Sequence, residues 1–200
     1  ADEKGTSYEL PYLGKFSCEN SVAHPNSGDK TLVVGLDDST PGQVYLYVGG
    51  KQDNGNPVER AGLQNGLLYG IKVTNGGPNY GGSAVTLENN GAVSGSFTLH
   101  PFTRAQAAGT GAALQAESVA RGVTENPNVF YWVTTGASLG GQAQSAKLYK
   151  LTFDSIANPT GGTIALVVDA ASLTGTDGVT ARSFDNMVVD ADGNIIIQED

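Results

Sequence analysis

The sequence carries the same pattern near both of its ends. Residues 19–38 (ENSVAHPNSGDKTLVVGLDD) and residues 185–200 (DNMVVDADGNIIIQED) each begin with an acidic residue followed by Asn. Each continues with a short apolar run, a polar turn that contains Gly, a second apolar run and a closing acidic pair. A repeated strand–turn–strand pattern restricts the fold, because it is typical of proteins built from copies of one supersecondary unit.

Short apolar and aromatic runs between turn-rich segments predict an almost entirely β protein. The 28 Gly residues, about twice the usual share of ~7%, agree with many turns. Residues 112–121 predict one short helix, and the Gly- and Asn-rich residues 75–96 predict a long loop. Strands are expected at residues 31–36, 44–48, 67–73, 129–134, 147–153, 164–168 and 195–198.

Three or four short antiparallel strands followed by a new copy of the motif form the pattern of a β-propeller blade. Blade-like sets are expected at about residues 19–74, 117–169 and 184–200. A closed propeller needs about 4–8 blades, so the sequence predicts an incomplete propeller within a longer chain. Its open strand edges would be paired by the remaining part of that chain or by neighbouring copies.

The net charge of −9 argues against nucleic acid and against an anionic membrane surface as partners. It suits a secreted or periplasmic protein, or one that binds cations, with plain solubility as the alternative. The longest apolar runs have about five residues, too few to span a membrane. Cys18 is the single cysteine, which excludes an internal disulfide, and we expect it to be a small buried residue.

The sequence lacks the common motifs of nucleophilic and nucleotide-dependent enzymes, namely G-x-S-x-G, the Walker loop and the dinucleotide fingerprint. His24 and His100 share no spacing with a Ser and an Asp that would indicate a triad, so surface or loop positions are expected. Residues 190–194 (DADGN) predict a hairpin turn rather than a calcium loop. Their Gly falls one position early, and the chain has no Glu at the twelfth position.

Most of the chain resembles the PhoX-type alkaline phosphatase-like proteins, which are secreted bacterial β-propellers. The resemblance rests on residues 5–73, on NPNVFYWVTTG, on SAKLYKLTFDSIANPTGGTIALVVD and on FDNMVVDADGNIIIQED. It implies a calcium-dependent phosphatase that acts on phosphate esters, with calcium, and iron as well, held by carboxylates at the propeller axis. Oxygen ligands of this kind suit Ca²⁺. The positions that match the ligand pattern are Glu19, Asn20, Asp185, Asn186, Glu199 and Asp200.

One departure from that family leaves two functions open. The family has an acidic inner strand before NPNVFYW, whereas here GVTE runs directly into it and leaves Glu125 as the one acid at the junction. Either the metal site is incomplete, or the given sequence omits residues. The first function is therefore part of a metal-dependent phosphoesterase. The second is a non-catalytic β-rich module for binding or assembly at the cell surface or in the extracellular space.

Overall fold

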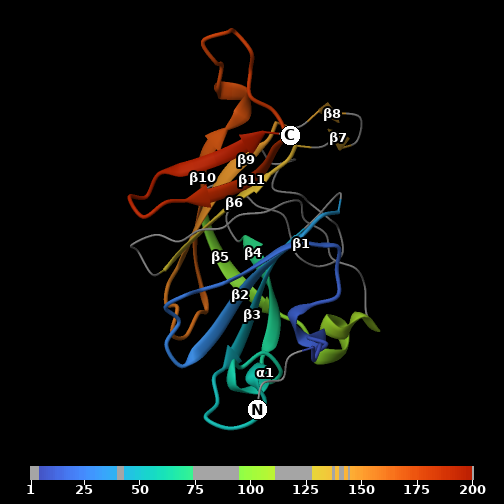
Figure 1. The fold of residues 1–200 in the computed structure, drawn as a ribbon. Helices are drawn as coiled ribbons and strands as arrows, with labels where there is room; N and C mark the ends of the chain where they lie inside the picture. Colours follow the sequence, from blue (N-terminus) through green and yellow to red (C-terminus); the bar gives the residue numbers. More distant parts are fainter. Residues whose placement is uncertain are drawn as a thin grey trace.

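The computed structural model describes residues 5–39, 43–73, 95–110, 128–136, 138–139, 142–143 and 145–199. About half of these residues form antiparallel strands, and the short helical turns lie between them (Figure 1). Among the described residues, no helix is both long and apolar enough to cross a lipid bilayer. The predicted all-β fold is therefore confirmed.

The main sheet has eight strands in the order β1-β2-β3-β4-β5-β10-β9-β6. The strands β1 to β5 form a meander, in which each strand pairs with the next along the chain. The other three strands do not continue the meander, because β10 lies between β5 and β9. The bounds of these strands are β1 (Cys18–Ala23), β2 (Lys30–Asp37), β3 (Val44–Gly50), β4 (Leu67–Val73), β5 (Gly95–Pro101), β6 (Val129–Thr134), β9 (Lys147–Phe153) and β10 (Gly161–Asp169).

Two further pairs of strands lie outside the main sheet. The hairpin of β11 (Phe184–Val189) and β12 (Ile195–Glu199) contacts β6 through β11. The pair β7 (Ser138–Leu139) and β8 (Gln142–Ala143) is much shorter. The helical turns are η1 (Pro11–Leu13), α1 (Pro57–Arg60), the π-helical turn η2 (Gln106–Thr110) and η3 (Ala170–Ser172).

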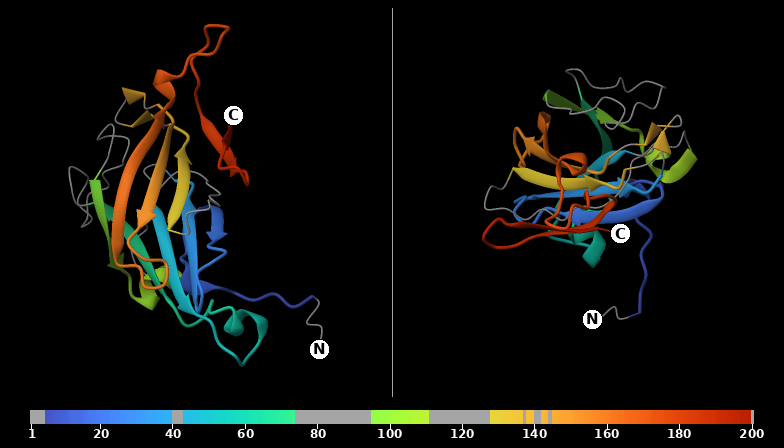
Figure 2. Two further views of the ribbon diagram at one scale, coloured as in Figure 1. Left: turned by 90° about the vertical axis from the view of Figure 1, so that its left-hand side faces the viewer. Right: turned by 90° about the horizontal axis from the view of Figure 1, so that it is seen from above.

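The sheet curls, so that its two edge strands β1 and β6 approach each other (Figure 2). His24 directly follows β1, and its ring meets the Phe130 ring of β6 edge-on, with 5.4 Å between the ring centroids. One apolar core fills the inside of the curl and combines residues of both halves of the sheet, such as Leu32, Leu46 and Leu151. The hairpin adds Met187 and other side chains to the same core.

A smaller core lies on the other face of the first strands, and it anchors the connection between β3 and β4. The hydroxyl of Tyr47 donates a hydrogen bond to the Gly62 carbonyl and accepts one from the Gly66 N–H, both at 2.8 Å. The Asn65 side chain pairs with both backbone groups of Gly50, and Asn56 caps α1 in a capping box. Since these bonds satisfy the backbone of the turn, this connection is an ordered part of the fold.

The structure confirms the seven predicted strands, three of them with the predicted bounds (β4, β6 and β9). The predicted helix at residues 112–121 lies outside the described residues, as do residues 75–94 of the predicted loop. The predicted end of that loop at residue 96 is wrong, because β5 begins at Gly95. In β5, Phe97 and Leu99 alternate with polar residues, and this pattern indicates a strand.

Three smaller expectations need comment. Cys18 is exposed rather than buried, because it lies on an edge strand with a free face. His24 occupies a loop as predicted, but it is buried there by its contact with Phe130. The division of the chain into three blade-like sets stays a prediction, and the structure adds that the first two sets share one sheet.

Replacing Phe97 by Ala should destabilise the protein by about 3–5 kcal/mol, because it empties a core position. Phe97 is 2% exposed, and its ring meets that of Phe153 edge-on at 5.2 Å. Its strand, β5, joins the two halves of the sheet. The free energy of unfolding in urea measures the effect. Thr98→Ala, an exposed neighbour on the same strand, is the matched control, and an equal loss in both variants would contradict the role given to the Phe97 ring.

Candidate functional site

The predicted metal ligands fall on two parts of the fold. Glu19, which is exposed, and Asn20, which is half-buried, lie on the edge strand β1. Asp185 and Asn186 lie on β11, and Glu199 ends β12. Asp200 lies outside the described residues. The site therefore divides into an edge-strand group and a hairpin group.

Both acidic residues that open the repeated motif lie in β-bulges. On β1, Cys18 is opposite Asp37 and Asn20 is opposite Leu36, so Glu19 is the extra residue. On β11, Phe184 is opposite Glu199 and Met187 is opposite Ile197, so one extra residue lies in the segment of Asp185 and Asn186. A bulge bends the strand and redirects a side chain, and bulges are common beside functional sites. The repeat in the sequence thus corresponds to a repeated irregularity of the backbone.

Backbone strain accompanies the second bulge. Ser183, immediately before β11, has a φ of 46°, in the left-handed region that residues other than Gly seldom adopt. Such a conformation persists only where the surroundings enforce it, and it is often found at functional sites. Here it leads directly into the bulge with Asp185.

The hairpin group already uses part of its hydrogen-bonding capacity within the protein. The Asn186 amide nitrogen donates to Asp185 Oδ2 at 2.6 Å, and the Arg182 N–H donates to Glu199 Oε1. Phe184 and Glu199 are cross-strand partners, so these three ligand candidates lie at the same end of the hairpin.

The donor types fit calcium, but the described residues do not complete a site for it. Calcium takes about six to eight oxygen ligands. Within the described ranges, no three His, Cys, Asp or Glu residues gather closely enough to hold a metal ion. The six residues therefore remain predicted ligands, and we derive no chemical step through a metal.

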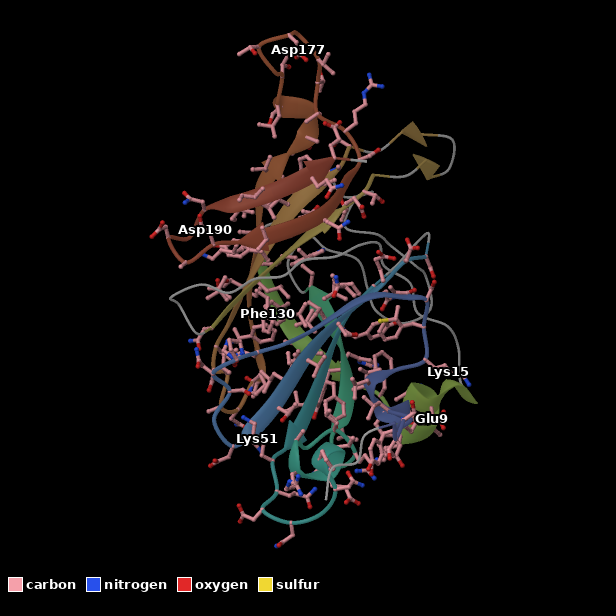
Figure 3. All side chains as sticks on the ribbon, in the orientation of Figure 1. Glu9, Lys15, Lys51, Phe130, Asp177 and Asp190 are labelled. Atoms are coloured by element: carbon pink, nitrogen blue, oxygen red, sulfur yellow. The ribbon has the colours of Figure 1, made fainter. Side chains whose placement is uncertain are left out.

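Asp190 holds the turn between β11 and β12 through hydrogen bonds. Its Oδ1 accepts hydrogen bonds from the N–H groups of Asp192 and Asn194 at 2.9 and 2.8 Å, and its Oδ2 accepts from the Asn194 side chain at 2.8 Å. Hydrogen bonds from Asn194 are the main reason why the pKa of Asp190 lies below its ordinary value. Figure 3 shows Asp190 at the tip of the hairpin, which confirms the predicted turn.

A buried lysine and a half-buried aspartate, which the sequence analysis did not identify, lie opposite each other where β9 begins and β10 ends. Lys147 is 3% exposed, faces Asp169 across the strands, and donates from Nζ to the carbonyl and hydroxyl oxygens of Ser145. Partial burial opposes ionisation of Asp169. The Ser145 hydroxyl, the Ala171 N–H and the charge of Lys147 nevertheless hold its pKa below the ordinary value. These contacts hold the ends of the two strands together.

A cavity of about 440 Å³ separates the hairpin from the main sheet. Its walls come from β9, β10 and the segment that connects η3 to β11 on one side and from the hairpin on the other. Eight of the nine lining residues are apolar, and Glu199 is the charged one. A phosphate group would find no cation in this lining, and the single charge has the wrong sign. The cavity therefore does not suit a phosphate ester.

Replacing Asp190 by Ala should loosen the hairpin, because three hydrogen bonds to the turn are lost at once. Faster amide hydrogen exchange in β12, relative to unchanged exchange in β9, is the expected result. Asp192→Ala removes an exposed carboxylate from the same turn and keeps the backbone N–H that bonds to Asp190, so it serves as the control. Equal exchange rates in all three proteins would show that Asp190 does not hold the turn.

Comparisons with known proteins identify the fold. No family model matches the sequence, and no curated protein matches it. Among solved structures, Pseudomonas fluorescens PhoX in complex with vanadate, a transition state analogue, is similar with a TM-score of 0.65 and 16% sequence identity. The similarity covers 96% of this chain and 40% of the PhoX chain, so this chain spans less than half the length of that protein. Together with the antiparallel strand sets and the repeated motif, this similarity shows that the chain has a PhoX-like β-propeller fold.

Proposed function

We propose that this chain is part of a secreted or periplasmic PhoX-like phosphoesterase that depends on metal ions. The observation that carries the proposal is the PhoX-like fold over 96% of the chain. The matched PhoX structure holds vanadate as a transition state analogue. Phosphate esters are the corresponding substrate class for this chain.

Metal ions would supply the catalytic power in such an enzyme. Cations that bind phosphoryl oxygens and activate a water remove the need for a nucleophile motif, and this sequence has none. Calcium is the first candidate because the predicted ligands are carboxylate and amide oxygens, and iron follows from the family resemblance alone. In the proposal, Glu19, Asn20, Asp185, Asn186, Glu199 and Asp200 supply ligands from the two motif copies.

One observation supports this assignment of the ligands. Glu19 and Asp185 open the two copies of the motif, and each lies in a segment where a bulge changes the direction of the strand. The family resemblance implies that these acids meet at the propeller axis, where they would repel each other unless a cation compensated. Since the chain spans 40% of the matched PhoX chain, further ligands would come from other parts of a longer protein.

The second candidate function is a non-catalytic binding or assembly module with the same fold. It is favoured by the lack of any group of three metal-binding side chains within the described residues. In this alternative, the fold is retained while the acidic residues of the motif serve the sheet edges.

Calcium should raise the melting temperature of the protein, because a ligand that binds the folded state stabilises it by mass action, by about 2.7 kcal/mol at a hundredfold excess over Kd. Chelation should reverse the effect, and Glu19→Gln should weaken calcium binding by roughly 10-fold or more. Glu9→Gln is the matched control. It removes the same charge from an exposed position outside the motif, near η1 (Figure 3).

Hydrolysis of p-nitrophenyl phosphate, assayed with calcium and with iron added, tests the activity. We expect the 200-residue chain alone to turn over little substrate and the longer protein to require the metal. Two results together would instead support the non-catalytic module. These are an unchanged melting temperature with calcium and no metal-dependent hydrolysis by the longer protein. Efficient metal-dependent hydrolysis by the 200-residue chain would show that its own residues complete the site.

A further inference from the structure

One wall of the cavity between the hairpin and the main sheet is a single strand face. Ile195, Ile197 and Glu199 all line the cavity, and they are alternate residues of β12. Successive side chains of a strand point to opposite faces, so these three share one face. Ile196 lies between them in the sequence, belongs to the other face and is 59% exposed. The inner face of β12 therefore supplies two aliphatic side chains and, at its end, one carboxylate.

The opposite wall contains a β-bulge. Leu166 of β10 pairs with Tyr149 and Val168 pairs with Leu148, so Val167 is the extra residue. Val167 and Val168 both line the cavity although they are consecutive in the sequence. In a regular strand, alternation would direct one of them away from it, whereas a bulge redirects a side chain. The bulge of β10 thus adds apolar surface to the cavity.

The cavity combines a buried apolar part with an opening to solvent. Among its lining residues, Phe184 and Leu148 are buried, whereas Val167 and Leu173 are large apolar side chains that remain exposed. Its volume of about 440 Å³ falls within the range of ~300–1,000 Å³ that is usual for small-molecule sites. Since burial of apolar surface is favourable, an apolar ligand that covers these side chains gains free energy on binding.

Glu199 determines which head group such a ligand can carry. Its Oε1 accepts a hydrogen bond from the Arg182 N–H, and among the described residues its Oε2 has no hydrogen-bond partner. The described lining residues include no Lys, Arg or His, so this carboxylate is the one charge among them. A cationic head group is attracted to it, and an anionic head group is repelled. Because Glu199 is exposed, the head group would lie at the mouth of the cavity.

We propose that this cavity binds an aliphatic amine, with the alkyl chain between β10 and β12 and the ammonium group at Glu199. The alkyl chain contacts the valine and isoleucine side chains of the two strands, and the ammonium group donates a hydrogen bond to Glu199 Oε2. Affinity then depends both on the positive charge of the head group and on the length of the chain. Binding does not require the proposed phosphoesterase activity.

Titration calorimetry of the 200-residue chain with primary alkylamines, from butylamine to octylamine, tests the proposal. Each added CH₂ group should lower Kd by about fourfold until the cavity is filled, because burial of one CH₂ contributes about 0.8 kcal/mol. 1-Octanol should bind roughly 5-fold more weakly than octylamine, and octanoate more weakly still. A chelator in the buffer keeps the measurement separate from the predicted role of Glu199 as a metal ligand.

Three variants assign the binding to this cavity. Glu199→Gln should remove the preference for octylamine over 1-octanol and leave the affinity for 1-octanol unchanged. Ile197→Trp should fill the cavity and abolish the binding of octylamine. Ile196→Trp is the matched control, because it adds the same indole to the outward face of the same strand, and it should bind octylamine as the unmodified chain does.

Methyl NMR of the unmodified chain keeps the proposal testable even if Ile197→Trp fails to fold. Octylamine should shift the methyl signals of Ile195 and Ile197 in a saturable manner and leave those of Ile196 unchanged. The proposal is overturned if octylamine shows no saturable binding, if 1-octanol or octanoate binds as tightly, or if Ile196 shifts as much as Ile197. A dimer that Ile197→Trp abolishes would also overturn it, because a second copy would then occupy the cavity.

Discussion

The pairing of β5 on both of its edges is the constraint on which the rest of the structure depends. β5 pairs with β4 on one side and with β10 on the other, and it thereby joins the first four strands of the sheet to the last three. Without this strand, the halves would be two small sheets, each with an open apolar face. With it, one curled sheet encloses one core, and the rings of His24 and Phe130 meet where the edge strands approach.

The curl of the sheet also explains the position of the hairpin. A sheet that bends until its edges approach leaves part of its core uncovered beyond β6, and β11 lies there. Met187, Val189 and Phe184 complete the core from this side. The outward face of the hairpin carries two exposed apolar side chains, Val188 and Ile196, which are cross-strand partners. The hairpin that forms the second copy of the motif therefore packs against the core through one face only. The first strands of a further blade-like set would pack in the same way.

The acidic residues of this protein divide into two kinds by their surroundings. Asp154, Asp169 and Asp190 are bonded by hydroxyl or backbone N–H groups at strand ends, and their carboxylates are stabilised in the ionised form. Glu19 and Asp185 lie instead where the strands bulge, and Asp37 is buried with one oxygen unpartnered. The first kind serves the fold. The second kind includes Glu19 and Asp185, on which the proposed function rests.

Local patterns in the sequence determined the strands, the repeated motif and the turn at Asp190, since side-chain alternation and turn residues act over a few positions. The same local reasoning missed β5, whose alternation follows a long Gly-rich segment, and it placed Cys18 in the interior. It named the acids of the motif without indicating that they lie in bulges, because a bulge depends on the register of the partner strand. Only the tertiary structure decided the strand order, the shared core and the burial of Asp37. These three features depend on contacts between residues far apart in the chain, and no short stretch of sequence indicates such contacts.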